Sequence, residues 1–133
     1  AAVTLPAEAS QADMEAATAS TTYVSPRRVI SSPYAAKAWC KWGTTTTIDA
    51  SQGVSSITDN GTGDWTLNWS TAFSSANYAV SYILNQGTST VNVYKICAVA
   101  SQASSSVRLF SVNPATGVGI DPINNYIAAF GDQ

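Results

Sequence analysis

The sequence predicts an all-β fold, an antiparallel β-sandwich or jelly roll of about eight short strands, preceded by a short helical N-terminal arm. From residue 36 onward, segments rich in β-branched and aromatic residues recur at a spacing of roughly 8 to 14 residues, with Gly, Asn, Asp and Ser clusters between them. Before residue 36 the chain is rich in alanine and supports only short helices. Its 133 residues suit one compact domain. We therefore expect an arm over residues 1–35 and a β-sandwich domain over residues 36–133.

The arm contains two helix start signals. Ser10 is a candidate N-cap, with the acidic Asp13 in the first turn. Ser25 precedes Pro26, which suits the first position of a second helix, and Pro33 ends that helix. Helices this short are marginal in water because nucleation is costly. The arm is therefore expected to pack against something else.

The β domain is predicted from alternation along the chain. In residues 65–69, Trp65, Leu67 and Trp69 share one face, which we assign to the core. The preceding run at 59–64 reads as a hairpin turn, since its glycines allow positive φ. The expected strands cover residues 36–42, 44–50, 54–58, 65–69, 77–84, 91–100, 106–112 and 125–130.

Two of these strands, 77–84 and 91–100, are apolar on both faces. Either they are central strands covered on each side, or a partner chain covers them. Trp39 falls on the same face of its strand as two lysines, and a large exposed aromatic side chain is typical of an interface. We therefore interpret Trp39 as a subunit contact. Low charge and abundant Ser and Thr make a homo-oligomer easy to accommodate.

Composition excludes several classes of function. Charged residues make up 11% of the chain, the net charge is -2 and the pI is about 4.7, so the basic surface of a nucleic-acid binder is missing. No apolar run approaches the roughly 18 residues that a membrane span needs. The chain has no histidine, which removes Ser-His-Asp and Cys-His catalysis and every metal site that uses histidine. We expect no enzyme activity and no cofactor.

The remaining chemistry-bearing residues give no strong pattern. Asp59 and Asp64 flank a Gly-rich run, but their spacing does not match an EF-hand calcium loop. Nothing distinguishes them as a pair for glycoside hydrolysis either, so no metal site and no catalytic site is predicted. Cys40 and Cys97 lie in apolar strand-like runs. Two reduced thiols are the favoured interpretation, and a single disulfide stays an alternative.

Three runs of residues carry a resemblance. They are AKAWCKW (36–42), VSSITDNGTGDWTLNWSTAFSSANYAV (54–80) and the closing AAFGDQ. Together they resemble the C-terminal tip domain of tailed-bacteriophage tail-fibre and virion-appendage proteins. Upstream, ASQADMEAATASTTYVSP (9–26) looks like the junction segment that precedes such tip domains. The resemblance covers the chain from about Ala9 onward, and Trp65 and Trp69 stand where that group usually has Tyr or Phe.

This resemblance implies a virion protein assembled in the host cytoplasm, a homotrimer that adheres to the host surface without catalysis. Residues 36–133 would be the tip domain, and the arm over residues 1–35 would serve attachment to other virion proteins and trimerisation. The partner would be a host cell-surface saccharide or protein, with no nucleic acid and no membrane insertion. An alternative is a head fibre or capsid-decorating structural protein. A polysaccharide depolymerase is less favoured, because it would need a longer chain or a convincing carboxylate pair.

Receptor contacts are expected at the end of the sandwich remote from the shaft, where loops are free to meet a surface. Uncharged donors and acceptors in turns suit sugar hydroxyls. The candidates are Asp59, Asn60, Asp64, Asn85, Gln86, Asn124, Asn125 and the neighbouring Tyr126.

Overall fold

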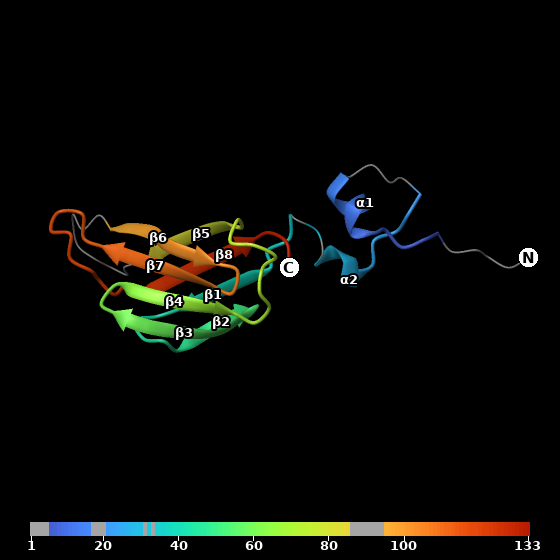
Figure 1. Ribbon diagram of the computed structural model, residues 1–133. Helices are drawn as coiled ribbons and strands as arrows, with labels where there is room; N and C mark the ends of the chain where they lie inside the picture. The colour runs from blue at the N-terminus through green and yellow to red at the C-terminus, as the bar shows by residue number, and fades with distance from the viewer. Residues whose placement is uncertain (1–5, 17–20, 31, 33, 86–94) are drawn as a thin grey trace, which may run out of the picture.

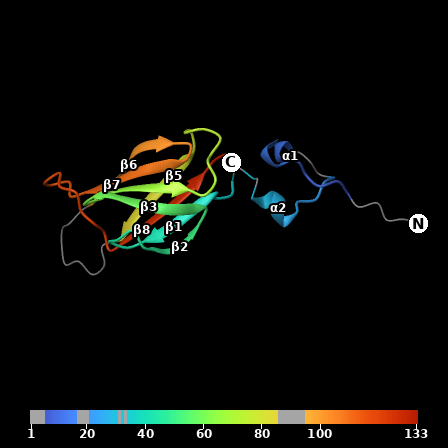
Figure 2. The same ribbon diagram turned by 60° about the horizontal axis from the view of Figure 1, so that its bottom comes forward.

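A computed structural model shows an arm with two short helices and a β-sandwich (Figure 1). It describes residues 6–16, 21–30, 32, 34–85 and 95–133. The arm leaves one end of the sandwich, and the C-terminus lies at that same end (Figure 2). Within the described residues, no helix is long and apolar enough to cross a membrane.

The arm's helices begin where the sequence predicts. Helix α1 (Gln11–Ala16) follows Ser10, whose hydroxyl accepts a hydrogen bond from the Asp13 amide at 3.2 Å. The Asp13 carboxylate in turn accepts from the Ser10 amide at 2.8 Å, a reciprocal cap that holds the pKa of Asp13 below its ordinary value. Helix α2 (Pro26–Val29) starts at the predicted proline. Neither helix is long enough to stand alone, and α1 buries none of its residues.

In the described part of the chain, the β domain has eight strands, in agreement with the prediction of about eight, in two four-stranded antiparallel sheets. The first sheet has the order β2-β1-β8-β5 and the second the order β3-β4-β7-β6. The all-β sandwich is therefore confirmed. The strands are β1 (Ala38–Trp42), β2 (Ile48–Gln52), β3 (Val54–Gly61), β4 (Asp64–Trp69), β5 (Ala79–Asn85), β6 (Ile96–Ala103), β7 (Ser106–Val112) and β8 (Asn124–Phe130).

The core lies between the two sheets. Trp65, Leu67 and Trp69 of β4 all point inward with exposures of 1%, 0% and 6%, which confirms their assignment. Trp42 of β1 crosses Trp65 edge-on, with ring centroids 6.2 Å apart. Burial of these large rings supplies much of the apolar area that holds the sheets together.

Two sequence predictions about strands are wrong. The strand expected from residue 44 begins only at Ile48, because residues 44–46 form bends before it. The strands around 77–84 and 91–100 are not central: β5 and β6 are each the last strand of their sheet. Residues 91–94 of the second segment lie outside the described residues. The other reading of these strands, cover by a partner chain, stays open.

Both cysteines are free thiols, as favoured from the sequence. Cys40 is buried on the inward face of β1, and this burial raises its thiol pKa to about 11. Cys97 of β6 is half-buried, and its thiol lies 3.2 Å from the Tyr82 carbonyl oxygen of β5.

Candidate functional site

The end of the sandwich away from the arm is built from loops of distant sequence. The β3–β4 turn and the loop at residues 113–123 lie together at this end (Figure 1). The Gly63 amide donates to Asp121 Oδ1 at 2.7 Å and so joins the two. Gly63 has a φ of 73°, and a Cβ there would lie 2.3 Å from the Ser111 carbonyl oxygen, so only glycine fits. The β3–β4 turn and the loop at residues 113–123 are thus held together at the remote end.

Asn60 and Asp64 come together at the β3–β4 hairpin. The Asn60 side-chain amide donates to Asp64 Oδ1 at 3.2 Å and to Thr66 Oγ1 at 2.9 Å. Asp64 and Thr66 point to the outer face of the sheet, because they alternate with the inward Trp65 and Leu67 of β4. Asn60 of β3 reaches that face through its contacts with both.

Arg108 of β7 completes this cluster and was not predicted. Its guanidinium binds the Asp64 carboxylate through two hydrogen bonds of 2.9 and 2.5 Å. Hydrogen bonding to Arg108 holds the pKa of Asp64 below its ordinary value, against a smaller opposing effect of burial. The same guanidinium lies 5.1 Å from the ring centroid of Phe110, which is 36% exposed. The sequence signal that could have found Arg108 is the alternation of residues 106–112, which places its side chain on the outer face of the strand.

The outer face of this sheet continues as a polar ladder. The Asn68 amide donates to Ser56 Oγ at 3.0 Å and lies 3.5 Å from Thr58 Oγ1, across the β3–β4 pair. Asp59 faces its own turn, where its carboxylate accepts from the Gly61 amide at 2.8 Å. Of the three candidates in this hairpin, Asp59 therefore acts as a turn former, and Asn60 and Asp64 belong to the outer face.

A second group of candidates lies at the end of β5 and the start of β8. Asn85 and Asn124 are opposite each other in the antiparallel register. Tyr126 is 36% exposed on the outer face of that sheet, opposite Ile83. Gln86 lies outside the described residues.

Asn125 does not belong to a receptor surface, so this prediction is wrong. Its side chain points inward and is 0% exposed. Asn125 Oδ1 accepts from the Tyr82 hydroxyl at 2.8 Å, and Nδ2 donates to the Gly43 carbonyl at 3.1 Å. A buried amide satisfied on both sides anchors the loop after β1 to the core. The error arises because adjacent strand residues face opposite ways, and Asn124 and Asn125 were treated alike.

Trp39 lies on the outer face of the first sheet and is 39% exposed. Its indole N–H donates to Gln52 Oε1 at 3.3 Å, which fixes the ring against β2. The outward orientation expected from the sequence is thus present, and the subunit contact stays a prediction.

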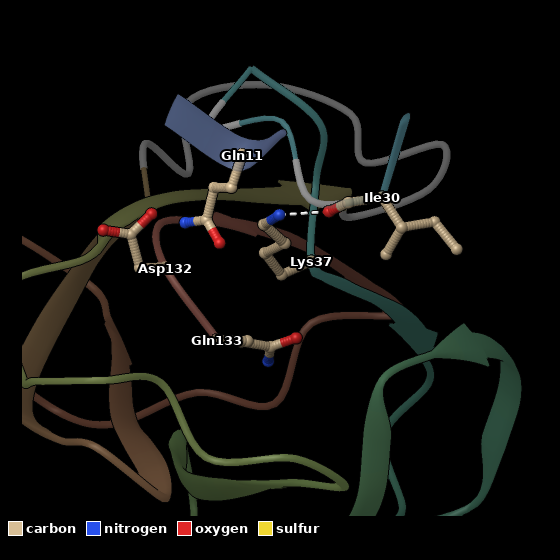
Figure 3. A pocket seen from close by; sticks show the side chains of 5 residues that line it. All are labelled: Gln11, Ile30, Lys37, Asp132 and Gln133. Atoms are coloured by element: carbon tan, nitrogen blue, oxygen red, sulfur yellow. Dashed lines mark hydrogen bonds between the residues drawn. The ribbon is translucent and has the colours of Figure 1, made fainter. Parts of the chain in front are cut away.

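A hollow at the junction of arm and sandwich is shown in Figure 3. It is lined by Gln11, Ile30, Lys37, Asp132 and Gln133 and has a volume of about 90 Å³. The Lys37 ammonium, in a residue only 7% exposed, donates to the Ile30 carbonyl just after α2. A second hollow of about 190 Å³ lies beside Tyr78 and Gly131. Both are smaller than the roughly 300 to 1,000 Å³ typical of ligand pockets. Neither hollow is lined by the receptor candidates at the remote end.

Metal-ligating residues do not cluster in the described part of the chain: no three of its Cys, Asp and Glu residues meet as a group that could hold an ion.

Comparisons with known proteins give one solved structure of interest. No protein-family model matches the chain, and no curated protein matches it. The phiAB6 tailspike, solved in complex with three-repeated oligosaccharides of Acinetobacter baumannii surface polysaccharide, matches with a TM-score of 0.48 and 13% identity. The match covers 71% of this chain and 20% of the tailspike chain. Similarity this loose transfers no residue role to the present chain.

Proposed function

We propose that this chain is a non-catalytic structural module of a bacteriophage virion, a fibre tip that adheres to the host surface. The observation that carries the proposal is the arrangement of its two ends. Four polar candidates from three separate parts of the chain belong to strand ends remote from the arm (Figure 1): Asn60, Asp64, Asn85 and Asn124. The arm at the opposite end would join other virion proteins. The sequence resemblance to tail-fibre tip domains supports the same arrangement.

The chemistry of the remote end suits a neutral saccharide or a polar protein surface. Asn60 and Asp64 form a rigid cluster with Arg108, so little side-chain entropy would be lost on binding. Amides and hydroxyls donate and accept hydrogen bonds without requiring charge on the partner. Weak single contacts would gain avidity from several copies on one particle.

The absence of catalysis is part of the proposal. A glycoside hydrolase needs one carboxylic acid with a raised pKa to protonate the leaving group. Asp64 has the opposite property, since Arg108 lowers its pKa and keeps it ionised. Asp59 accepts a hydrogen bond from its own turn. Neither residue is arranged as a general acid.

We also propose that the chain forms a homotrimer. The arm supports this because its apolar side chains are largely uncovered, although short helices need packing. Their exposures are 48% for Tyr23, 47% for Val24, 51% for Val29, 57% for Ile30 and 77% for Tyr34.

Adsorption of particles that carry variant chains to their propagation host tests the function. A triple variant, Asn60→Ala, Asn85→Ala and Asn124→Ala, should reduce the adsorption rate about tenfold or more through lost avidity. Asn77→Ala makes the same chemical change at the arm end and should have no effect. Triple-variant particles that adsorb at the parental rate would contradict the proposal and favour a head-decorating role. Release of reducing sugar ends from host polysaccharide would contradict the non-catalytic assignment.

A further inference from the structure

The outer face of the β2-β1-β8-β5 sheet carries two exposed aromatic side chains. Trp39 of β1 is 39% exposed and Tyr126 of β8 is 36% exposed. In the β1–β8 register, Trp39 lies opposite Ala128 and Lys41 lies opposite Tyr126, so the two aromatic residues share one face. They are diagonal neighbours on adjacent strands, with α-carbons about 7 to 8 Å apart, close enough for one ligand to contact both rings. We call the outer surface of Trp39, Lys41 and Tyr126 the Trp39 face.

The two rings of the Trp39 face are fixed but not engaged in stacking. The hydrogen bond from the Trp39 indole to Gln52 Oε1 holds that ring in place, which lowers the entropy lost on binding. In the described part of the chain, no other aromatic ring or cation stacks on Trp39 or Tyr126. Phe110, on the outer face of the other sheet, differs because the Arg108 guanidinium lies 5.1 Å from its ring centroid.

Polar groups border the rings on two sides. Lys41 Nζ pairs with Asp49 Oδ2 of β2 at 2.9 Å, so the charges on this part of the face cancel. Asn124 precedes Tyr126 by two residues on β8 and therefore points to the same face, opposite Asn85 of β5. The Trp39 face thus continues into the end of the sandwich that is remote from the arm.

We propose that the Trp39 face binds a saccharide chain of the host surface. The C–H face of a pyranose ring is apolar and packs on aromatic rings, while its hydroxyls both donate and accept hydrogen bonds. A sugar hydroxyl beside Trp39 donates to the Asp49 carboxylate or accepts from the Lys41 ammonium, so the ion pair stays satisfied. A protein that laid apolar side chains over the same rings would desolvate this ion pair at a cost in free energy. The ion pair therefore favours a saccharide over a second protein chain.

This inference rests on the proposed function and deepens it, because it names a saccharide as the host molecule and the Trp39 face as its site. Trp39 is then a receptor contact rather than a subunit contact. Asn85 and Asn124 extend the same site toward the remote end.

Calorimetric titration of the full chain tests the proposal, with oligosaccharides released from the surface polysaccharide of the propagation host as the probe. The parent should bind them, and Trp39→Ala and Tyr126→Ala should each raise the Kd about tenfold or more, because each removes an aromatic contact. Trp39→Phe keeps a ring and should stay within about threefold of the parent. Ile96→Ala is the matched control, since Ile96 is 51% exposed on the outer face of the other sheet. This control should bind with the parental Kd.

Circular dichroism and light scattering on each variant separate lost binding from lost structure. If Trp39→Ala fails to fold, Tyr126→Ala carries the test. A folded alanine variant with the parental Kd would overturn the inference, and so would a parent that binds none of the oligosaccharides. A Trp39→Ala chain that folds but has a lower mass than the parent would also overturn it, because the face would then lie between copies. Each of these results leaves the adsorption test of the triple variant standing, so the two proposals fail separately.

Discussion

The two lateral sides of the sandwich are closed by different means. On the β2/β3 side, the chain turns directly from one sheet to the other through Gly53, and charged residues occupy both strands. On the β5/β6 side, the sheets are held by side chains at the arm end and the strands are uncharged. A side closed by the backbone and marked by charge suits solvent. The other side is closed by hydrogen bonds from side chains, and the difference teaches that the two ends of each sheet are joined by different kinds of contact.

Gly53→Ala should produce the largest loss of stability. Gly53 has a φ of 71°, and a Cβ there would lie 2.5 Å from the Lys37 carbonyl oxygen. Backbone strain together with this clash should cost about 3 kcal/mol in the free energy of unfolding. Gly117→Ala is the control, since Gly117 has a φ of 68° and open space around it. Urea denaturation should give a clearly smaller loss for the control, and equal losses would show that the close approach at Gly53 is unimportant.

Tyr78→Phe tests the closure of the other side and should have a smaller effect. The Tyr78 hydroxyl accepts from the Trp69 indole at 3.1 Å and donates to the Ser106 carbonyl at 2.7 Å. Gln102 of β6 also donates to the Tyr78 carbonyl at 3.0 Å. Loss of the hydroxyl leaves a buried indole N–H without a partner, which should cost about 1.5 kcal/mol.

Tyr34→Phe is the matched control for Tyr78, because Tyr34 is 77% exposed in the arm. Thermal unfolding should leave this variant unchanged. A Tyr78→Phe variant as stable as the parent would mean that packing of the Tyr78 ring on Phe73, at 4.1 Å between centroids, closes this end by itself.

The smallest effect is expected from acid. Asp64 has a pKa below its ordinary value of 3.8 in the folded state because of its hydrogen bonds from Arg108. A lowered folded-state pKa gives stability that is fully present above 3.8 and is lost as the pH falls toward the folded-state pKa. Asp64→Asn should therefore melt slightly lower than the parent at pH 7 and lose less stability between pH 5 and pH 2. Parallel melting curves of the two proteins over that range would contradict the role of this ion pair.

Alternation along the chain was enough to predict the strands and the inward face of β4. The spacing of Trp65, Leu67 and Trp69 defines a buried face whatever the partner strands are. Strand order could not be predicted in the same way, because β5 pairs with β8 more than 40 residues later. For this reason β5 and β6 read equally well as central strands or as covered edges.

The candidate site was predicted only in part for similar reasons. The Asn60 and Asp64 cluster followed from turn chemistry, which is local. Arg108 joined it through the β4–β7 register, in which Thr66 lies opposite Arg108. Asn125 was misplaced because turn composition does not say which face of the adjoining strand a residue will occupy.

Amide hydrogen exchange measured at low and high protein concentration tests the central claim most directly. Backbone amides of α1 and α2 should exchange more slowly as concentration rises, because the arms of several copies would pack together in the proposed homotrimer. Amides of β2 should exchange at the same rate at both concentrations. The account would be contradicted by exchange in α1 and α2 that does not depend on concentration, or by equal slowing in β2.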